Sequence, residues 1–255
     1  MAIILDGKKL SEKILENLKR DILRTPDVRK KLRLVAILVG NDSQSNIFLR
    51  QKEKACRFVG VGFRLFKFPE NISQKELAQK VKEIGKKENQ GIIIQLPLPK
   101  HIDAEKILSL IPAEKDVDAL SGKKIKAGIL SPVLAGILSL LKEYKISFKN
   151  KKVAVVGRGR LVGQPVMEWL KKHRVEIVDD TKKADIVISG VGKPGFAIKG
   201  DMIKKGAIVI DAAGDVDFKT VAPKAGFITP VPGGLGPMTV AKVIENLIIL
   251  SQKSS

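Results

Sequence analysis

The 255-residue sequence contains few of the residues that build metal centres, disulfides and aromatic surfaces. It has one cysteine, Cys56, two histidines, His101 and His173, one tryptophan and one tyrosine. A single cysteine excludes an internal disulfide and is typical of the reducing cytoplasm, which we expect as the location. So few histidines and cysteines form no metal-ligand cluster, so we expect no metal.

The sequence also lacks an apolar run long enough to cross a bilayer, and residues 1–6 carry no basic leader of the kind that begins a signal peptide. We therefore expect no membrane partner. Apolar residues nevertheless make up 44% of the chain. That fraction is enough for a packed core in one large or two modest domains.

Acidic residues are in short supply. The 27 Asp and Glu stand against 47 Lys and Arg, which gives a formal net charge of +20. Such a charge could attract nucleic acid or an acidic small molecule. Aromatic residues are only 4% of the chain, too few for a surface on which bases stack. We interpret most of the lysines as solvated basic faces and expect no nucleic-acid partner.

Strand-like and helical patterns alternate in the first half of the chain. Apolar runs predict strands at residues 33–39, 62–68 and 91–95. Helices are predicted between them, one over residues 42–58 and one that begins with the capping box of residues 73–76. This alternation predicts a parallel α/β layer.

A glycine-rich turn organises the second half. Residues 153–156 predict a buried parallel strand, and residues 164–171 predict the helix that follows it. Gly157, Gly159 and Gly163 lie between them with the spacing G-x-G-x-x-x-G, which is longer than the usual dinucleotide fingerprint. Such glycines let the backbone approach a pyrophosphate at a helix N-terminus, so we expect a dinucleotide site here. An ordinary strand-to-helix turn is the alternative.

The second half continues as an α/β pattern. Further strands are predicted at residues 175–178, 185–189, 207–210 and 227–229. Asp179 and Asp180 stand where an acidic residue would meet a ribose hydroxyl of the cofactor. Residues 230–237 are rich in proline and glycine and predict a rigid, irregular loop before a closing helix at residues 238–250.

Two motifs are highly specific when they occur together: Gln-Leu-Pro-Leu-Pro at residues 95–99 and Pro-Val-Pro-Gly-Gly at residues 230–234. Further stretches accompany them in order, at residues 39–42, 52–56, 115–118, 157–163 and 191–195. Taken from end to end, these stretches resemble the methylenetetrahydrofolate dehydrogenase/cyclohydrolase family. The resemblance implies a two-domain α/β fold with the substrate cleft between the domains.

By this resemblance, a parallel α/β domain that binds folate and carries catalysis is expected at residues 1–119 plus 236–255. A Rossmann-like NAD(P)-binding domain is expected at residues 120–235. The family dimerises through its cofactor domain, so a homodimer is expected. Its members oxidise 5,10-methylenetetrahydrofolate to the 5,10-methenyl form with a nicotinamide cofactor, and then hydrolyse that form to 10-formyltetrahydrofolate. Tetrahydrofolate derivatives are thus the expected substrates, in one-carbon metabolism and purine biosynthesis.

The motif match also assigns catalytic roles. It implies that Lys52 handles protons in the hydrolytic step, that Gln95 hydrogen-bonds this lysine, and that Asp118 holds the pterin ring. A lysine must lose its proton to act as a base, so its pKa must fall. Taken singly, each residue has an ordinary structural alternative, such as a solvated helix lysine, a strand-end cap or a turn residue. The match also implies further substrate contacts from Phe48, Leu96, Pro97, Pro232, Gly233 and Gly234.

For the cofactor, the glycine turn and the match together predict contacts from Gly157, Arg158, Gly159, Val162, Gly163, Asp179, Gly192 and Gly214. The family habit favours NADP, whereas a carboxylate beside the ribose favours NAD. NADP is therefore the expected cofactor, with NAD as the alternative.

The sequence departs from the family pattern in several places. Phe48 stands where the family has tyrosine, and the segment of residues 179–184 and the turn after Asp211 are both shorter than in the family. Both shortened segments lie beside the expected cofactor site. An alternative function is therefore a cyclohydrolase with weakened dehydrogenase activity. A basic nucleic-acid-binding protein is the alternative from another class.

Overall fold

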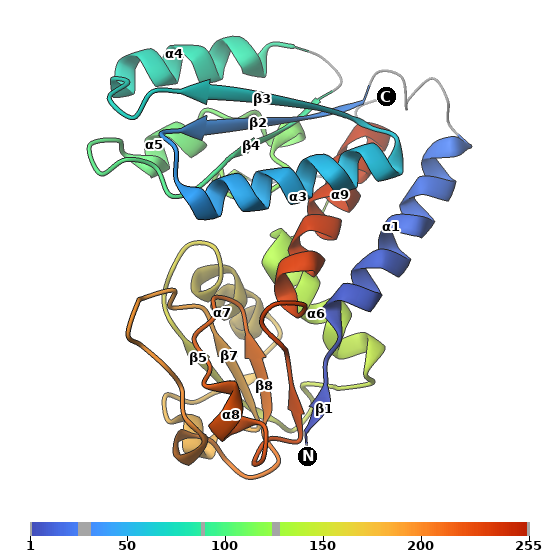
Figure 1. The fold of residues 1–255 in the computed structure, drawn as a ribbon, viewed down its shortest axis with the longest axis vertical. Helices are drawn as coiled ribbons and strands as arrows, with labels where there is room; N and C mark the ends of the chain where they lie inside the picture. Colours follow the sequence, from blue (N-terminus) through green and yellow to red (C-terminus); the bar gives the residue numbers. More distant parts are fainter. Residues whose placement is uncertain (1, 25–31, 88–89, 124–127, 254–255) are drawn as a thin grey trace. The chain divides into compact units, whose positions relative to one another are not determined.

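The computed structural model describes residues 2–24, 32–87, 90–123 and 128–253. By its internal contacts the chain divides into two compact units (Figure 1). Unit 1 contains Met1–Ser11 and Val133–Thr239, and unit 2 contains Glu12–Pro132 and Val240–Ser255. The chain passes from one unit to the other within two of its helices and once more at Pro132.

Unit 2 is built on a parallel three-stranded sheet in the order β3-β2-β4. Its elements are β2 (Arg33–Val39), α3 (Ser43–Val59), β3 (Gly62–Phe68), α4 (Gln74–Gly85), β4 (Gln90–Ile94), α5 (Ala104–Leu108) and the 3₁₀ turn η1 (Ala113–Lys115). The central strand β2 is buried on both faces, as expected of a parallel sheet covered by helices. One face packs against α3 and α9, and the other packs against α4 and α5 (Figure 1).

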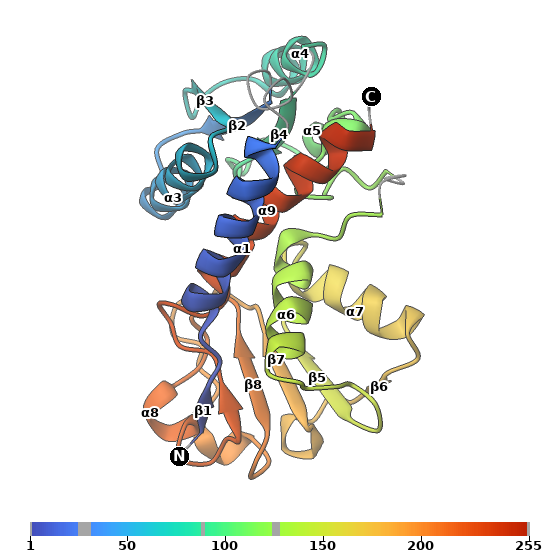
Figure 2. The same ribbon diagram turned by 90° about the vertical axis from the view of Figure 1, so that its right-hand side faces the viewer.

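Unit 1 is built on a parallel six-stranded sheet in the order β1-β9-β8-β7-β5-β6. Its strands are β1 (Ile3–Ile4), β5 (Lys152–Val156), β6 (Glu176–Ile177), β7 (Ile186–Ser189), β8 (Ile208–Asp211) and β9 (Phe227–Ile228). Its helical segments are α6 (Pro132–Glu143), α7 (Gly163–Lys172), η2 (Thr181–Lys183), η3 (Gly200–Met202) and α8 (Phe218–Val221). Helix α7 packs against β5 and β6 (Figure 2). The glycine turn of the sequence therefore joins the second strand of this sheet, counted from its β6 edge, to α7.

The expected fold class is confirmed, but the unit boundaries differ from the expected domains. Strand β1 joins the edge of the unit 1 sheet, where the Ile3 N–H donates to the Gly226 oxygen (2.8 Å) and the Leu5 N–H donates to the Ile228 oxygen (2.8 Å). Residues 1–11 therefore belong to unit 1, whereas residues 120–132 belong to unit 2. A two-residue strand is too short to leave a periodic signal in the sequence, which explains the difference.

The two remaining helices run through both units. Helix α1 extends over Gly7–Leu23, and α9 extends over Leu235–Lys253. Helix α9 thus begins before the expected residue 238. Pro237 lies in its first turn, where a helix makes no hydrogen bond with the backbone N–H that proline lacks. The irregular loop is correspondingly shorter than expected.

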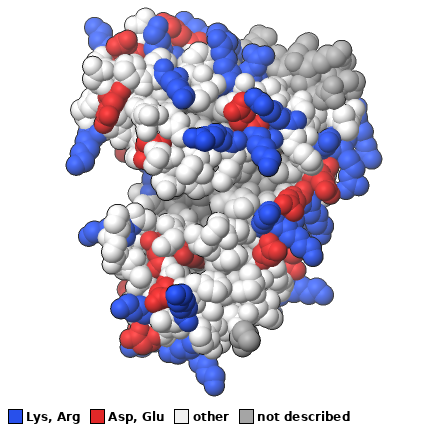
Figure 3. All heavy atoms as spheres, viewed as in Figure 1, with Lys and Arg blue, Asp and Glu red and all other residues white. Residues whose placement is uncertain are grey.

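The surface of the described residues agrees with the interpretation of the basic charge. In the face shown in Figure 3, lysine and arginine side chains are spread over the surface with acidic side chains among them. Ion pairs between such exposed side chains contribute little to the stability of the fold. Within the described ranges, no helix combines the length and the apolar character that a membrane span requires.

Candidate active site

The side chain of Lys52 points into unit 2 from helix α3. The helix begins after Asp42, whose carboxylate accepts the Ser45 N–H (2.7 Å), and this backbone bond lowers the pKa of Asp42. Ten residues into the helix, Lys52 is only 7% exposed. Its ammonium nitrogen Nζ donates to Oε1 of Gln95 at 3.0 Å. The structure thus brings together two of the three predicted catalytic residues, although they lie 43 positions apart in the chain.

The position of Gln95 is fixed from both ends. Its backbone N–H donates to the Ile37 oxygen (2.8 Å), which extends the pairing of β4 with the central strand. Its side-chain Nε2 donates to the Leu96 oxygen (3.0 Å), and the Ser45 hydroxyl donates to the same oxygen (3.4 Å). Because the amide nitrogen is occupied in this way, the amide oxygen faces Lys52.

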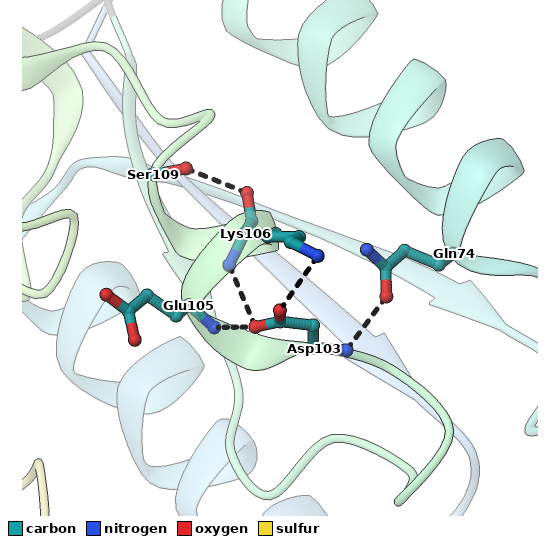
Figure 4. Close-up of polar contacts among 5 residues, drawn as sticks. All are labelled: Gln74, Asp103, Glu105, Lys106 and Ser109. Carbon is teal, nitrogen blue, oxygen red and sulfur yellow. Dashed lines mark hydrogen bonds and ion pairs between the residues drawn. The ribbon is translucent and has the colours of Figure 1, made fainter.

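The loop that follows Gln95 is anchored at its far end by the cap of α5 (Figure 4). The Asp103 carboxylate accepts the Glu105 and Lys106 N–H groups at 3.0 and 3.2 Å, and chiefly the bond from Lys106 lowers the pKa of Asp103. The Asp103 N–H donates to Oε1 of Gln74 (2.9 Å), the first residue of α4. The Leu-Pro-Leu-Pro loop is therefore held between β4 and α4.

Asp118 and Lys52 perturb each other's protonation. Burial raises the pKa of the Asp118 carboxyl from 3.8 to about 6, against the attraction of Lys52 and with a smaller contribution from the like charge of Asp116. Burial also lowers the pKa of Lys52, although the negative charge of Asp118 opposes this. The neutral amine of Lys52 is therefore more accessible than that of a solvated lysine.

Cys56 follows Lys52 by one helical turn and is fully buried. Burial raises the pKa of its thiol to about 12, so the thiol is a packing group rather than a nucleophile. Among the described residues, no group of three or more His, Cys, Asp and Glu side chains is arranged to hold a metal ion.

The other predicted substrate contacts fall into both units. Phe48 lies one turn before Lys52 on α3 and is 38% exposed. Leu96 and Pro97 follow Gln95 in unit 2, with a cis peptide bond between them. Pro232, Gly233 and Gly234 belong to unit 1. There the Gly233 oxygen accepts the Lys8 N–H (2.8 Å), and a Cβ at Gly7 would overlap the Gly234 oxygen.

The glycine turn of unit 1 requires glycine at two positions and leaves open space at others. Gly157 has φ +98°, and a Cβ at Gly163 would overlap the Gly157 oxygen and the Arg158 backbone. A Cβ at Gly159, by contrast, would meet no atom closer than about 4 Å. Helix α7 begins at Gly163 without a side-chain cap. These features fit a dinucleotide, because they present open backbone and a helix N-terminus without a side-chain cap to its pyrophosphate.

Two buried carboxylates hold the loops after β7 and β8. Asp211 accepts the backbone N–H groups of residues 213–216 at 2.7–3.0 Å. Asp215 accepts the Ser189 hydroxyl (2.8 Å) and the N–H groups of residues 191–192 (2.6 and 2.9 Å). Gly192 and Gly214 therefore lie in loops fixed at the carboxyl edge of the sheet. Although the turn after Asp211 is short, it is fully hydrogen-bonded through this residue.

The remaining predicted cofactor residues have distinct surroundings. Val162 is buried, and a Cβ at Gly190 would overlap its side chain, so this valine packs the turn against β7. An Arg158 guanidinium nitrogen lies 3.5 Å from an Asp179 carboxylate oxygen, with the two side chains 65% and 97% exposed. Asp180 instead turns back to cap η2, where its carboxylate accepts the Lys182 N–H (2.9 Å).

Two family models match the chain. The tetrahydrofolate dehydrogenase/cyclohydrolase catalytic domain matches residues 5–118, and the NAD(P)-binding domain of the same family matches residues 131–255. The chain belongs to the tetrahydrofolate dehydrogenase/cyclohydrolase family. Similar family members include the Bifunctional protein FolD of Nautilia profundicola, 42% identical over 96% of this chain and 95% of the relative. The FolD of Aquifex aeolicus is 41% identical over 97% of this chain and 94% of its own length.

Solved structures of this family have the same fold. The bifunctional FolD of Campylobacter jejuni superposes with a TM-score of 0.90 at 33% identity and covers 100% of both chains. The FolD of Trypanosoma brucei, solved with NADP and an inhibitor, superposes with a TM-score of 0.91 at 29% identity, covering 99% of this chain and 98% of that one. The family resemblance read from the sequence motifs is therefore confirmed.

Family motifs did not reveal four buried polar residues that shape the site: Asp116, Asp211, Asp215 and Asn246. Each acts on backbone groups, and Asn246 reaches groups more than a hundred positions away. Asp116 lies in one of the stretches that resemble the family, and Asp211 ends an apolar run, but neither signal names a hydrogen-bond partner.

We predict that Gly163→Ala weakens binding of NADP and NAD alike by roughly fivefold to a hundredfold, because the added Cβ overlaps the Gly157 oxygen. Backbone strain of about 1–3 kcal/mol is the expected cost. Calorimetry with each dinucleotide measures the loss. Hydrolysis of methenyltetrahydrofolate should persist, since Lys52 lies in unit 2. Parent-like dinucleotide affinity in a folded variant would remove this turn from the cofactor site.

Proposed function

We propose that this chain oxidises 5,10-methylenetetrahydrofolate to 5,10-methenyltetrahydrofolate with a nicotinamide cofactor and hydrolyses the methenyl form to 10-formyltetrahydrofolate. Membership of the tetrahydrofolate dehydrogenase/cyclohydrolase family supports both activities. The single observation that carries the hydrolytic assignment is the hydrogen bond from the buried Lys52 to Gln95, beside Asp118. A lysine is rarely buried in this way unless its partners or its function require it.

In the hydrolytic step, water attacks the methenyl carbon, and the proton that water loses needs an acceptor. Neutral Lys52 can accept it, because burial lowers its pKa. One N–H of the amine donates to Gln95, which leaves the nitrogen lone pair free for the proton. A cationic methenyl group nearby would lower the pKa of Lys52 further. The protonated amine can then return the proton to the departing ring nitrogen as the ring opens, while the hydroxyl group on the former methenyl carbon releases its remaining proton to solvent and becomes the formyl oxygen.

Asp118 is proposed to hold the pterin ring through the ring's N–H donors. A carboxylate accepts such donors in pairs and fixes the ring plane. With a pKa of about 6, the Asp118 carboxyl is mostly ionised at neutral pH and can serve as this acceptor. Its negative charge also attracts the cationic methenyl substrate.

The cofactor half of the proposal rests on unit 1. Gly157, Gly159 and the N-terminus of α7 would hold the pyrophosphate, and Arg158 would lie near the adenine ribose. When bound, the nicotinamide supplies the acceptor for the hydride. The FolD of Trypanosoma brucei was solved with NADP, which supports NADP as the cofactor. Arg158 can pair with the phosphate that distinguishes NADP from NAD, but only in competition with Asp179.

A second candidate is a cyclohydrolase with weakened dehydrogenase activity. The shortened segments after β6 and β8 favour it, because both lie at the edge of the sheet where the cofactor is expected. The hydrogen bonds of Asp211 favour the bifunctional enzyme, because they hold the short turn after β8 in a defined conformation. Reduction of NADP and NAD, measured spectroscopically with methylenetetrahydrofolate, decides between the two candidates.

We further propose a homodimer formed through unit 1, a cytoplasmic location, and a role in supplying formyl groups for purine biosynthesis. The family resemblance supports all three, and the single buried cysteine is consistent with a reducing compartment. Light scattering during gel filtration tests the first proposal. A mass near twice the 27.9 kDa of the chain is expected, and a monomer at micromolar concentration would contradict it.

We predict that Lys52→Met lowers the rate of methenyltetrahydrofolate hydrolysis by about 10²- to 10⁴-fold, the usual contribution of a positioned proton-transfer group. The decay of methenyltetrahydrofolate absorbance measures this rate. The matched control is Lys54→Met, an exposed lysine on the same helix, which should hydrolyse at the parent rate. Parent-like hydrolysis by the Lys52 variant would exclude the lysine from the mechanism.

We predict that Asp118→Ala weakens binding of a stable folate analogue and removes its pH dependence. In the parent, the ionised carboxyl prevails above its pKa of about 6, so affinity should fall as the pH drops from about 7.5 to 5. An unpaired pterin donor costs about 1–3 kcal/mol, or roughly fivefold to a hundredfold in affinity. Calorimetric titrations across this pH range measure both effects. A parent affinity that is flat across that range would refute the assignment.

We predict that Asp179→Ser raises the NADP/NAD ratio of kcat/KM, because Arg158 is freed for the additional phosphate. An exposed ion pair contributes about 0.2–1 kcal/mol, so the ratio should rise by up to about fivefold. Asp180→Ser is the control: its carboxylate caps η2, so the ratio should stay at the parent value. An unchanged ratio in the Asp179 variant would show that this carboxylate does not face the ribose.

A further inference from the structure

The turn that carries Asp118 is held by a buried residue of the closing helix. We call residues 116–121 the Asp118 turn. Asn246 lies on α9 and is only 2% exposed. Its side-chain Nδ2 donates to the Val117 oxygen (2.8 Å) and to the Leu130 oxygen (2.9 Å). Both hydrogens of the amide nitrogen are therefore used, one of them on the Asp118 turn.

The bond to Val117 acts directly on Asp118. The carbonyl carbon of Val117 is bonded to the backbone nitrogen of Asp118, so both belong to one planar peptide unit. A hydrogen bond that fixes the Val117 oxygen fixes the plane of this unit and, with it, the direction in which the Asp118 side chain leaves the backbone. Asn246 is thus one peptide unit away from the carboxylate that is proposed to bind the pterin.

The turn is also closely packed on the opposite side. A Cβ at Gly91, on β4, would overlap the side chains of Val117 and Leu247, so no space separates the strand, the turn and helix α9. Glycine is required at position 91, because the Val117 and Leu247 side chains approach its backbone too closely for a Cβ. Leu247 follows Asn246 directly and lies in the same core cluster as Val117, so consecutive residues of α9 serve the packing of this core and the hydrogen bond to the Val117 oxygen.

Within the turn, a second buried carboxylate sets the backbone path. Asp116 is fully buried, and its Oδ2 accepts the Ser121 N–H at 2.7 Å. Between them, Ala119 has φ +53°, a left-handed conformation that non-glycine residues adopt only when their surroundings enforce it. The Asp118 turn is therefore constrained by its own hydrogen bonds and by the side-chain hydrogen bond from Asn246 on α9.

We infer that Asn246 is a positioning residue for folate binding: through the Val117–Asp118 peptide unit, it holds the Asp118 carboxylate in the orientation that receives the pterin. This inference rests on the proposed role of Asp118. Asn246 itself is not a catalytic residue, because it is buried behind the turn and its amide hydrogens are used on backbone oxygens. The closing helix thereby contributes to substrate recognition as well as to the core.

A purely structural role makes a different prediction. If Asn246 only tied α9 to the core, its loss would lower stability and leave the folate affinity of the folded protein unchanged. If it positions Asp118, its loss lowers the affinity, and the loss depends on the presence of the Asp118 carboxylate. A double-mutant cycle separates these cases.

The experiment measures the dissociation constant of a stable reduced-folate analogue, by calorimetry at pH 7.5, for the parent chain, Asn246→Ala, Asp118→Ala and the double variant. Asn246→Leu is added because it fills the space of the amide and keeps the variant folded if a cavity destabilises the alanine form. Ile248→Ala is the control, since Ile248 is buried in the same core cluster on the same helix. Thermal unfolding of every variant reports stability separately.

The inference predicts about tenfold weaker folate binding for both Asn246 variants, the factor that corresponds to about 1.4 kcal/mol. It predicts no further weakening when Asn246→Ala is added to Asp118→Ala, parent-like affinity for Ile248→Ala, and unchanged NADP affinity throughout. Equal weakening by Asn246→Ala in both backgrounds would overturn it, as would lower stability with parent-like affinity. If Asp118→Ala itself binds the analogue normally, the proposed role of Asp118 fails, and the inference fails with it.

Discussion

The structure of unit 2 depends on keeping a lysine buried. An ammonium group loses much of its hydration inside a protein, so burial disfavours its charged form unless partners compensate. Lys52 has Gln95 as a neutral acceptor at 3.0 Å and Asp118 as a nearby negative charge. These partners are enough to keep the lysine inside but not enough to cancel the effect of burial on its pKa. A lowered pKa is what the proposed role of Lys52 as a base requires.

The fixed segments come from all parts of unit 2. Gln95 extends the sheet pairing of β4, and the loop after it is tied to α4 through Asp103. Asp118 lies on a turn that is held by Asp116 from within and by Asn246 from α9. Unit 1 uses the same kind of device, since Asp211 and Asp215 satisfy the backbone of the loops after β7 and β8. In both units, buried polar side chains shape loops that apolar packing alone would leave undetermined.

The sequence predicted what is encoded locally. The strands of both sheets follow from short apolar runs, and the pairing of Lys52 with Gln95 follows from family motifs. The sequence did not predict β1, because two residues carry no periodicity and the partner strand lies more than two hundred positions away. It did not reveal Asn246 for a similar reason, since the carbonyl it binds is 129 positions distant. The lowered pKa of Lys52 was expected from its role and from burial, and burial is its main cause in the structure.

Lys52 is buried, and burial lowers its pKa. Titration of the Lys52 side chain measures this pKa directly. The side-chain resonances of ¹³C-labelled lysines can be followed by NMR from pH 6 to 12, with the Lys52→Met variant identifying the signal of Lys52. We expect the Lys52 signal to titrate below the ordinary value of 10.5 and to be missing from the spectrum of that variant. A Lys52 signal that titrates at or above 10.5 would contradict it.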